Sequence, residues 1–280
     1  MNLKPGWSET DGELWYARPG GGGRVRARGV WRTCQNVRCG ARFPSLPGNP
    51  GKYCSFSCIH SANGGHHRRG TRDDLFTRWD VDECWLAGIL WTDGSLCDAN
   101  DGRGTRKVKI AMTDQAVIQE AARITGCTPH SYEQKPPRQT VHEIRFAARD
   151  VVGRLAEAGM DQPKLTTRSW PALPHPAAFL RGLMDGDGYV TWHYQGKRTA
   201  TSKLRLFACL CGSMPLLTGA QGYLKEFGIK PKNPYPAGAS KRIYSVGWNH
   251  ADCLRLAKIL YSDDGPCMAR KRAAFLNDPN

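Results

Sequence analysis

The chain contains one short apolar segment twice. Residues 85–96 read Trp-Leu-Ala-Gly-Ile-Leu-Trp-Thr-Asp-Gly-Ser-Leu, and residues 179–190 read Phe-Leu-Arg-Gly-Leu-Met-Asp-Gly-Asp-Gly-Tyr-Val. Both follow the pattern aromatic-Leu-x-Gly-apolar-apolar-x-x-Asp-Gly-x-apolar, and their Asp-Gly pairs are 94 residues apart. A repeated segment of this kind predicts a chain built from two similar halves. We expect each copy to be a short helix that ends at its Asp-Gly pair.

Each copy carries a glycine and an aspartate with a physical meaning. Gly88 and Gly182 leave room for another backbone to approach closely, and the glycine of each Asp-Gly pair suits a left-handed helix C-cap. A carboxylate at a helix C-terminus is unfavourable, because the helix dipole is negative there. Two such ends side by side would be worse unless a cation lay between them. The pattern therefore predicts that Asp93 and Asp187 are metal ligands where two helices pack.

The rest of each half follows the same order of elements. After the first copy we expect strands around 95–99 and at 106–112, a helix over 116–124, strands around 130–135 and 140–146, and a helix over 149–158. After the second we expect strands at 189–195 and 203–209, a helix over 214–227, strands near 233–236 and 242–248, and a helix from 249. Alternating and 3.6-residue apolar periods support these assignments. The order αββαββα is thus written twice.

These features resemble the LAGLIDADG family of homing endonucleases over residues from about 80 to 275, in its single-chain form with two motifs. The resemblance implies that the last acid of each motif, Asp93 or Asp187, binds a divalent metal ion. The earlier acid is Asp185 in the second motif but Trp91 in the first, a departure from the pattern. Arg181 replaces a small residue, and we expect it to be accommodated at the helix edge.

The resemblance implies an α+β fold in which two pseudo-symmetric αββαββα repeats form a saddle over the DNA major groove. It also implies a nuclease encoded by a mobile genetic element. Such an enzyme makes Mg²⁺-dependent double-strand breaks at a long asymmetric site in double-stranded DNA, with one aspartate serving each strand. An RNA maturase or a transcription regulator built on the same saddle, without cleavage, is the alternative. Such relatives often lose the motif acids, and both acids are present here.

Phosphodiester hydrolysis needs an activated water, a polarised phosphate and a stabilised leaving oxygen, which carboxylate-held Mg²⁺ can supply. A lysine after the last helix of each half, Lys164 or Lys271, is expected to stabilise the developing charge. A purely phosphate-binding or solvent-exposed role for either lysine remains open. The catalytic residues that we expect are Asp93, Asp187, Lys164 and Lys271, and the Mg²⁺ ligands are Asp93, Asp187, Thr92 and Gly186.

Basic residues predict a polyanionic partner. The formal net charge is +15. Residues 1–70 carry 11 basic and 3 acidic side chains, residues 71–160 carry 12 and 14, and residues 161–280 carry 17 and 8. Because the middle segment has more acidic than basic side chains, its cations must lie together on one face if it binds DNA. Cations that alternate with apolar residues along a strand lie on one face in this way. The residues that we expect to bind DNA are Arg103, Arg106, Lys107, Lys109, Arg145, His193, Gln195, Lys197, Arg198, Lys203, Arg205, Lys241 and Arg242.

Four of the eleven cysteines lie within 25 residues, as Cys34-x4-Cys39 and Cys54-x3-Cys58. Two thiolate pairs separated by a Pro- and Gly-rich loop are typical of a structural zinc site, so we expect one Zn²⁺ per chain. Four unrelated buried thiols are the alternative. The organisation that we expect is a flexible basic arm (1–30), a zinc module (31–70), the first repeat (71–160), a linker (161–176) and the second repeat (177–280).

Several classes are disfavoured by the sequence. No stretch approaches the roughly 20 apolar residues of a membrane-spanning helix. The first residues lack the basic-then-apolar pattern of a secretory signal, and the odd cysteine count argues for a reducing compartment. An intein is disfavoured, because the sequence has neither a nucleophilic first residue nor a His-Asn ending. We therefore expect a monomeric protein in the cytoplasm of a bacterial or phage-infected cell, with double-stranded DNA as its partner and no membrane.

Overall fold

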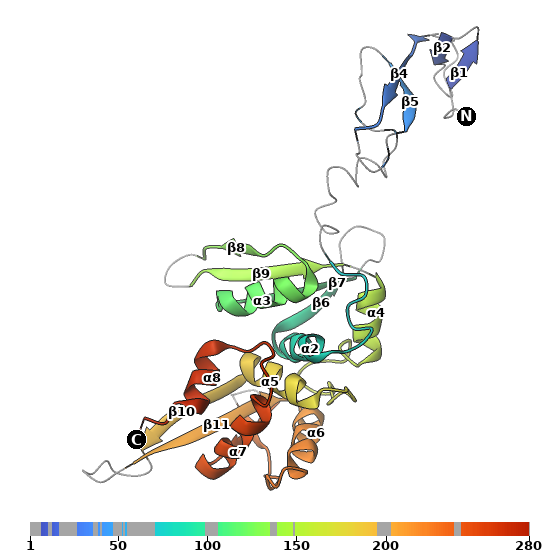
Figure 1. Ribbon diagram of the computed structural model, residues 1–280. Coiled ribbons are helices and arrows are strands. Elements are labelled where there is room, and N and C mark those ends of the chain that lie inside the picture. The colour runs from blue at the N-terminus through green and yellow to red at the C-terminus, as the bar shows by residue number, and fades with distance from the viewer. Residues whose placement is uncertain are drawn as a thin grey trace. The chain divides into compact units, whose positions relative to one another are not determined.

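The computed structural model describes residues 7–10, 13–16, 27–35, 39, 41–46, 52, 54, 71–98, 106–134, 139–147, 149–194, 203–237 and 242–279 (Figure 1). The chain divides into two units, Met1–Arg69 and Gly70–Asn280. Each unit has its own strands, and the second contains every helix among the described residues.

The first unit is built from short antiparallel strands. Strands β1 (Trp7–Thr10), β2 (Glu13–Tyr16) and β3 (Ala27–Arg28) form a three-stranded sheet in that order. Strands β4 (Val30–Thr33) and β5 (Arg42–Ser45) form a separate hairpin. The flexible arm expected over 1–30 thus contains paired strands, whereas its glycine run lies outside the described residues.

The first repeat consists of α2 (Val81–Asp93), β6 (Gly94–Asp98), β7 (Arg106–Met112), α3 (Gln115–Thr125), β8 (His130–Tyr132), β9 (Val141–Phe146) and α4 (Arg149–Glu157). The second consists of α5 (Pro176–Gly186), β10 (Gly188–Tyr194), β11 (Leu204–Gly212), α6 (Met214–Lys225), β12 (Tyr235–Ala237), β13 (Ile243–Trp248) and α7 (His250–Leu260). The predicted αββαββα order and the α+β class are therefore confirmed. A further helix, α8 (Ala269–Leu276), follows the second repeat and was not predicted.

Each repeat has one four-stranded antiparallel sheet. The strand order is β6-β7-β9-β8 in the first and β10-β11-β13-β12 in the second, so the two sheets have the same topology. One face of each sheet packs on helices through buried residues such as Val108, Ile110, Leu206 and Ala208. We call the other face the open face. The residues that alternate with the buried ones along each strand, such as Lys109 and Tyr189, lie on this open face.

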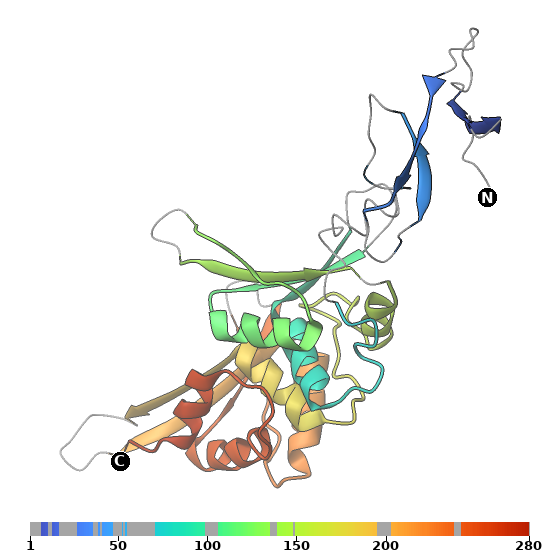
Figure 2. The same ribbon diagram turned by 45° about the horizontal axis from the view of Figure 1, so that its top comes forward.

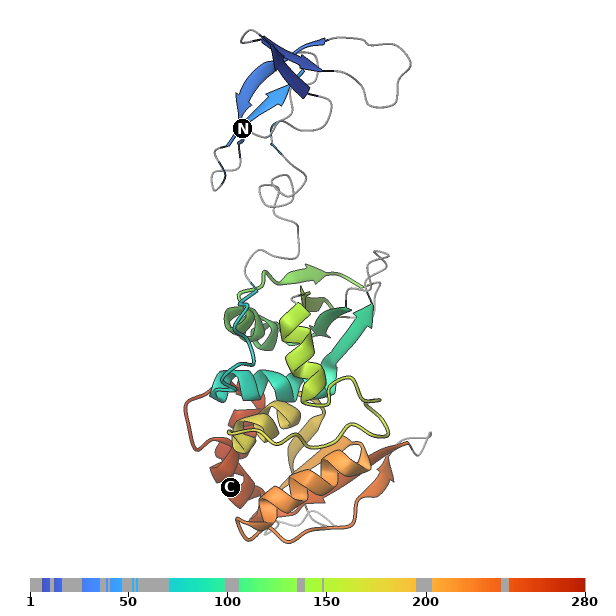
Figure 3. The same ribbon diagram turned by 90° about the vertical axis from the view of Figure 1, so that its right-hand side faces the viewer.

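The two motif helices, α2 and α5, pack against each other between the two sheets (Figures 1, 2 and 3). Gly88 and Gly182 meet where the helices cross. A Cβ atom on Gly88 would lie 2.3 Å from the Phe179 carbonyl oxygen, and one on Gly182 would lie 2.1 Å from the Trp85 carbonyl oxygen. Both distances are shorter than any real Cβ contact, so the predicted close backbone approach is confirmed. One hydrophobic core runs through both repeats.

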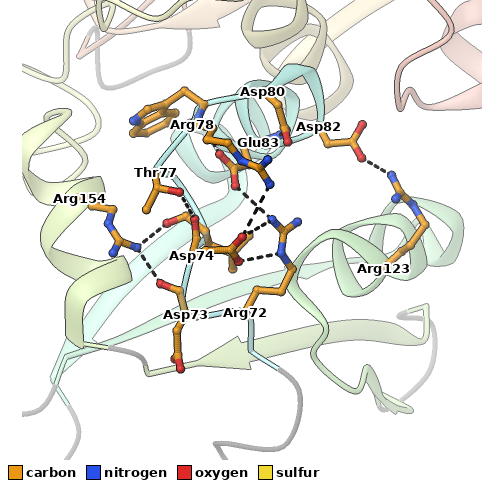
Figure 4. A network of polar contacts seen from close by, with 12 residues as sticks. Arg72, Asp73, Asp74, Thr77, Arg78, Asp80, Asp82, Glu83, Arg123 and Arg154 are labelled. Atoms are coloured by element: carbon orange, nitrogen blue, oxygen red, sulfur yellow. Dashed lines mark hydrogen bonds and ion pairs between the residues drawn. The ribbon is translucent and has the colours of Figure 1, made fainter.

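The start of α2 is fixed by a polar network (Figure 4). Asp80 is the N-cap and accepts the Glu83 backbone N–H at 2.9 Å, while Glu83 Oε2 accepts the Trp79 N–H at 2.8 Å. This arrangement resembles a capping box, except that Glu83 accepts from the residue before the N-cap instead of from the N-cap itself. Glu83 is fully buried, and its burial raises the pKa of its carboxyl. Arg154 donates to the carbonyl oxygens of residues 73 and 75, which ties α4 to the segment before α2.

Within the described residues, no helix is both long and apolar enough to cross a membrane.

Candidate functional site

The C-terminal ends of α2 and α5 bring Asp93 and Asp187 to one place. Asp93 is the last residue of α2 and Asp187 is the C-cap of α5. A Cβ atom on Gly186 would lie 2.6 Å from Asp93 Oδ2 and 1.9 Å from Thr92 Oγ1, so the two helix ends are in direct contact. The two aspartates that the repeat singled out are therefore neighbours, although 94 residues separate them in the sequence.

The glycines after these aspartates serve a purpose other than the one expected. Gly94 is the C-cap of α2 with φ −79° and ψ 149°, which is extended rather than left-handed backbone. Gly188 is not among the glycines with positive φ. A Cβ atom at Gly94 would lie 2.4 Å from the Leu90 carbonyl oxygen, and one at Gly188 would lie 2.4 Å from the Met184 carbonyl oxygen. The prediction of left-handed caps was wrong: glycine is needed because the first strand leaves close against the helix end.

The environment of Asp93 disfavours its charged form. Burial raises the pKa of its carboxyl, and the nearby Asp187 carboxylate raises that pKa further. The Thr92 hydroxyl, which donates to Asp93 Oδ2 at 3.1 Å, and the ammonium groups of Lys164 and Lys271 oppose this shift. The two carboxylates repel each other, and a cation bound between them would relieve that repulsion.

Lys164 reaches this site from the segment after the first repeat. Its Nζ lies 3.2 Å from Asp187 Oδ2 and also donates to the Thr92 carbonyl oxygen. The lysine thus follows the first repeat in the sequence but pairs with the acid of the second. Its side chain is 37% exposed, in contrast to the buried side chain of Lys271.

Lys271, in α8, lies in a different environment. Its side chain is buried, and its Nζ donates to the carbonyl oxygens of Met184 at 2.7 Å, Asp185 at 2.7 Å, Gly186 at 3.3 Å and Gly188 at 2.6 Å. These carbonyls belong to the last turn of α5 and the residues after it, where backbone oxygens lack helical partners. Burial lowers the pKa of Lys271 to about 8, against the opposing effect of Asp185. Lys271 therefore holds the helix end that presents Asp187.

Arg168, which was not predicted from the sequence, holds the end of α2 as Lys271 holds the end of α5. Its guanidinium is buried and donates to the carbonyl oxygens of Trp91 at 3.0 Å, Met160 at 2.7 Å and Gln162 at 3.3 Å. It thereby joins the end of α2 to the loop that carries Lys164. No motif marks this residue, because a single arginine in a linker has no distinctive sequence signal.

Asp185 is a structural residue in this geometry. It is buried, and its Oδ2 accepts the Trp85 indole N–H at 2.8 Å and the Met268 backbone N–H at 2.9 Å. These bonds join α2, α5 and the N-cap of α8. Burial raises the pKa of Asp185 to about 6. Trp91, which occupies the equivalent place in the first motif, is buried and donates its indole N–H to the Ser169 carbonyl oxygen at 3.0 Å.

Arg181 does not lie at a helix edge, as expected from the sequence, but is fully buried. Its Nη1 donates to the Leu260 carbonyl oxygen at 2.6 Å and lies 2.8 Å from Asp263 Oδ1. These partners follow α7, so the side chain extends into the second repeat instead of reaching solvent. The carboxylate and the carbonyl both face Nη1, whereas Nε and Nη2 are buried without a hydrogen-bond partner among the described residues.

The open face of the first sheet carries part of the predicted DNA-binding set. Lys107, Lys109 and Arg145 lie on it, and Lys109 is directly opposite Arg145 across the strands. Arg106 begins β7 with the parity of the helix-covered face, so it is not grouped with them. Arg103 lies outside the described residues.

The open face of the second sheet carries His193 and Arg205, which are paired across β10 and β11, and Lys203 directly precedes β11 with the same parity. Arg242 precedes β13 with the opposite parity. Gln195, Lys197, Arg198 and Lys241 lie outside the described residues.

The oxygen atoms at the two helix ends fit a divalent cation of the Mg²⁺ type. Such ions prefer carboxylate and carbonyl oxygens, and Asp93 and Asp187 supply two carboxylates that already repel each other. The other two expected ligands, Thr92 and Gly186, lie at the same place. Their carbonyl oxygens accept hydrogen bonds from Lys164 and Lys271.

In the first unit, three of the four predicted zinc ligands form a cluster. The sulfur atoms of Cys34, Cys39 and Cys54 lie within 4.8 Å of one another, and those of Cys39 and Cys54 are 3.6 Å apart. A tetrahedron with Zn–S bonds of about 2.3 Å has S···S edges of about 3.8 Å, so the spacing fits zinc. The Cys54 backbone N–H also donates to Cys34 Sγ at 3.4 Å. Cys58 lies outside the described residues.

One protein-family model matches the second repeat. The family model described as LAGLIDADG-like domain matches residues 174–245, which extend from the start of α5 into β13. No curated protein matches the chain.

Solved structures of LAGLIDADG proteins are also similar to the chain. The meganuclease I-AabMI bound to uncleaved DNA is 10% identical, over 68% of this chain and 86% of that one, with a TM-score of 0.45. I-DmoI in complex with DNA and Ca is 13% identical, over 70% and 97%, with a TM-score of 0.45. The meganuclease I-SmaMI bound to uncleaveable DNA is 9% identical, over 69% and 86%, with a TM-score of 0.48.

Proposed function

We propose that this protein is a sequence-specific, Mg²⁺-dependent endonuclease that cuts both strands of double-stranded DNA at a long asymmetric site. One observation carries the proposal. Asp93 and Asp187 lie together at the ends of two crossing helices, with the Lys164 ammonium 3.2 Å from Asp187. Paired carboxylates at helix C-termini are unfavourable for stability alone, which points to a role in binding cations.

Asp93 and Asp187 would hold the divalent cation, with the carbonyl oxygens of Thr92 and Gly186 beside it. Bound Mg²⁺ supplies an activated water and neutralises the charge that develops on the phosphate and the leaving oxygen. Lys164, whose side chain is partly exposed, would stabilise negative charge on the phosphate. Lys271 and Arg168 hold the last turns of α5 and α2, so that the two aspartates stay in place.

The open faces of the two sheets are proposed to bind the DNA. Their cations and polar groups are those that contact phosphates and base edges. The net charge of +15 and the LAGLIDADG-like match of the second repeat support this partner. We propose that the chain acts as a monomer, because it contains two halves with one acid each. We also propose that it acts in the cytoplasm, in keeping with its odd number of cysteines.

The first unit is proposed to bind one structural Zn²⁺ through Cys34, Cys39, Cys54 and Cys58. Residues 34–58 contain no carboxylate, so this module would extend the DNA-binding surface without taking part in cleavage.

A DNA- or RNA-binding protein without cleavage, such as a maturase or a transcription regulator, is the alternative. A binding protein needs the open faces but does not need the two acids. Dependence of strand cleavage on both aspartates therefore separates the two functions.

The test uses the full chain and a library of linear DNA duplexes in which the central segment is randomised. Wild-type protein with Mg²⁺ should release products cut on both strands at one enriched sequence. Asp93→Asn or Asp187→Asn should abolish double-strand cutting and leave binding to that sequence largely intact. Asp264→Asn is the matched control, because that carboxylate is fully exposed and away from the site. Undiminished cutting by both site variants, or binding without any Mg²⁺-dependent cutting by the wild type, would exclude the proposal.

A further inference from the structure

The two open faces are equivalent in register but differ in chemistry. Ser95 is two residues beyond Asp93 and pairs with Lys109 across β6 and β7, whereas Tyr189 is two residues beyond Asp187 and pairs with Cys209 across β10 and β11. Lys109 and Cys209 therefore occupy matching positions at the same distance along the strands from the two acids.

Around Lys109 the surface is an ion-pair cluster. Glu143 Oε2 lies 3.1 Å from Lys109 Nζ, and Glu143 Oε1 lies 2.6 Å from Arg145 Nη2. The Glu143 side chain is only 7% exposed, while the two cations are 30% and 48% exposed. The buried carboxylate thus pairs with two cations whose side chains are more exposed than its own. Lys107 extends the charged surface by two further residues.

Around Cys209 the matching positions, all within the described strands, carry no charged side chain. Gly247 is its partner across β11 and β13, in the place of Arg145, and Ser245 occupies the place of Glu143. Cys211 Sγ lies 2.8 Å from Ser245 Oγ. Phe207, in the place of Lys107, lies against Gly247, where a Cβ atom would be 3.0 Å from the Phe207 ring. Phe207 also contacts His193 edge-on, with ring centroids 5.9 Å apart.

Along β11 the first cation on the described open face is Arg205, four residues beyond Cys209. At about 3.3 Å per residue this is about 13 Å further from the acids than Lys109 lies on its own sheet. In duplex DNA that distance corresponds to about four base pairs, at about 3.4 Å each. If the duplex lies along the strands, the described cations of the second sheet would face the outer part of a half-site, and uncharged groups would face the inner part of that half-site.

We infer that the two half-sites differ in base composition next to the cleavage centre, with G·C pairs beneath Lys109 and Arg145 and A·T pairs beneath Cys209 and Phe207. The inference rests on the proposed DNA cleavage. Arginine and lysine donate to the O6 and N7 acceptors of guanine, which A·T pairs do not offer in the same arrangement. Phenylalanine and other apolar groups contact the thymine methyl, which has no counterpart in G·C pairs.

The experiment is cleavage selection by the full wild-type chain with Mg²⁺ from a duplex library randomised on both sides of the cleavage centre. The enriched site should have G·C pairs in one inner half-site and A·T pairs in the other. Lys109→Met should relax the preference only in the G·C half, and Phe207→Ser only in the A·T half. These two variants assign each half-site to its sheet.

Deoxyuridine then tests the methyl interaction without changing base pairing. Replacing dT by dU in the A·T half-site should weaken binding about fourfold for each methyl group that the protein touches. The same replacement elsewhere in the site should have no effect, and Phe207→Ser should remove the difference between dT and dU.

If no sequence is enriched, the proposed function fails and this inference fails with it. If a sequence is enriched but its inner half-sites are alike, or dU is as good as dT beside Phe207, only the inference is overturned.

Discussion

The ammonium of Lys164 lies 3.2 Å from the carboxylate of Asp187, so a lysine that follows the first repeat pairs with the acid that ends the second motif helix. Lys271 does not mirror this arrangement. It is buried and donates to four carbonyl oxygens at the end of α5. Two lysines at similar places in the sequence therefore have different roles.

Replacing these lysines should separate the two roles. Lys164→Met should slow DNA cleavage by about 100-fold, the effect of losing one charge-stabilising group, with little change in unfolding. Lys271→Met should lower the free energy of unfolding by about 3 kcal/mol, because buried carbonyl oxygens lose their donor, and should slow cleavage as well. Single-turnover cleavage and urea unfolding measure the two effects. Lys258→Met, at an exposed position on α7, is the control. Equal losses of stability in the two variants would contradict the division.

The pH dependence of stability should reveal the buried Asp185. Its folded-state pKa of about 6 lies above the unfolded value of about 3.9, so the folded chain retains a proton that the unfolded chain releases. The stability from this proton is complete below pH 4 and is lost as pH rises to 6. Asp185→Asn cannot ionise and keeps an acceptor for the Trp85 indole. Relative to this variant, the wild type should lose about 2 kcal/mol between pH 4 and pH 7. Parallel stability curves in metal-free buffer would contradict the buried-acid assignment.

The crossing of the motif helices should not tolerate a methyl group. Gly88→Ala places a Cβ atom 2.3 Å from the Phe179 carbonyl oxygen and 2.7 Å from the Gly182 Cα. The helices must separate, and we expect a loss of about 3 kcal/mol in the free energy of unfolding. Gly153→Ala on α4 is the matched control, since nothing lies within 4 Å of its Cβ position. That change should stabilise the protein by about 0.5 kcal/mol, because alanine favours the helix. A Gly88→Ala variant as stable as the control would show that the helices are less tightly packed.

Metal analysis should find one zinc ion per chain after purification without chelator. Cys39→Ser and Cys54→Ser each remove one sulfur of the cluster, so zinc content should fall. Cys267→Ser, which is outside the cluster, should leave it unchanged. Zinc content near zero in the wild type, or unaltered in the cluster variants, would count against the zinc module.

Removal of the first unit, residues 1–69, should change affinity more than specificity. This unit lies before the two repeats and is strongly basic, so it should bind mostly to phosphates. Binding of the truncated chain should weaken, and the salt dependence of log K should fall by about 0.9 for each phosphate that the truncated chain no longer neutralises. The preferred cleavage sequence should persist. Loss of preference at the central base pairs would mean that the first unit reads sequence.

The sequence by itself determined the architecture of the second unit. The duplicated Gly-x4-Asp-Gly spacing and the alternation of apolar residues predicted two αββαββα repeats, and the strand and helix bounds agree to within a few residues. Local periodicity was sufficient because each sheet and helix buries one face. Gly88 and Gly182 could be assigned to a helix crossing because few other roles require a small residue within an apolar helix.

Only the tertiary structure decided what surrounds the paired acids. Arg168 and Lys271 became recognisable because they meet unpaired carbonyl oxygens from segments up to 87 residues away. Arg181 was expected at an edge but is buried, with Nη1 beside Asp263 and the Leu260 carbonyl oxygen. The alternation of residues along a strand predicted which face of the sheet each residue lies on. The contrast between the Lys109–Glu143–Arg145 cluster and the uncharged surface at Cys209, however, depends on which residues are opposite one another on neighbouring strands. Such juxtapositions arise from strand pairing between distant segments, and no local pattern in the sequence encodes that register.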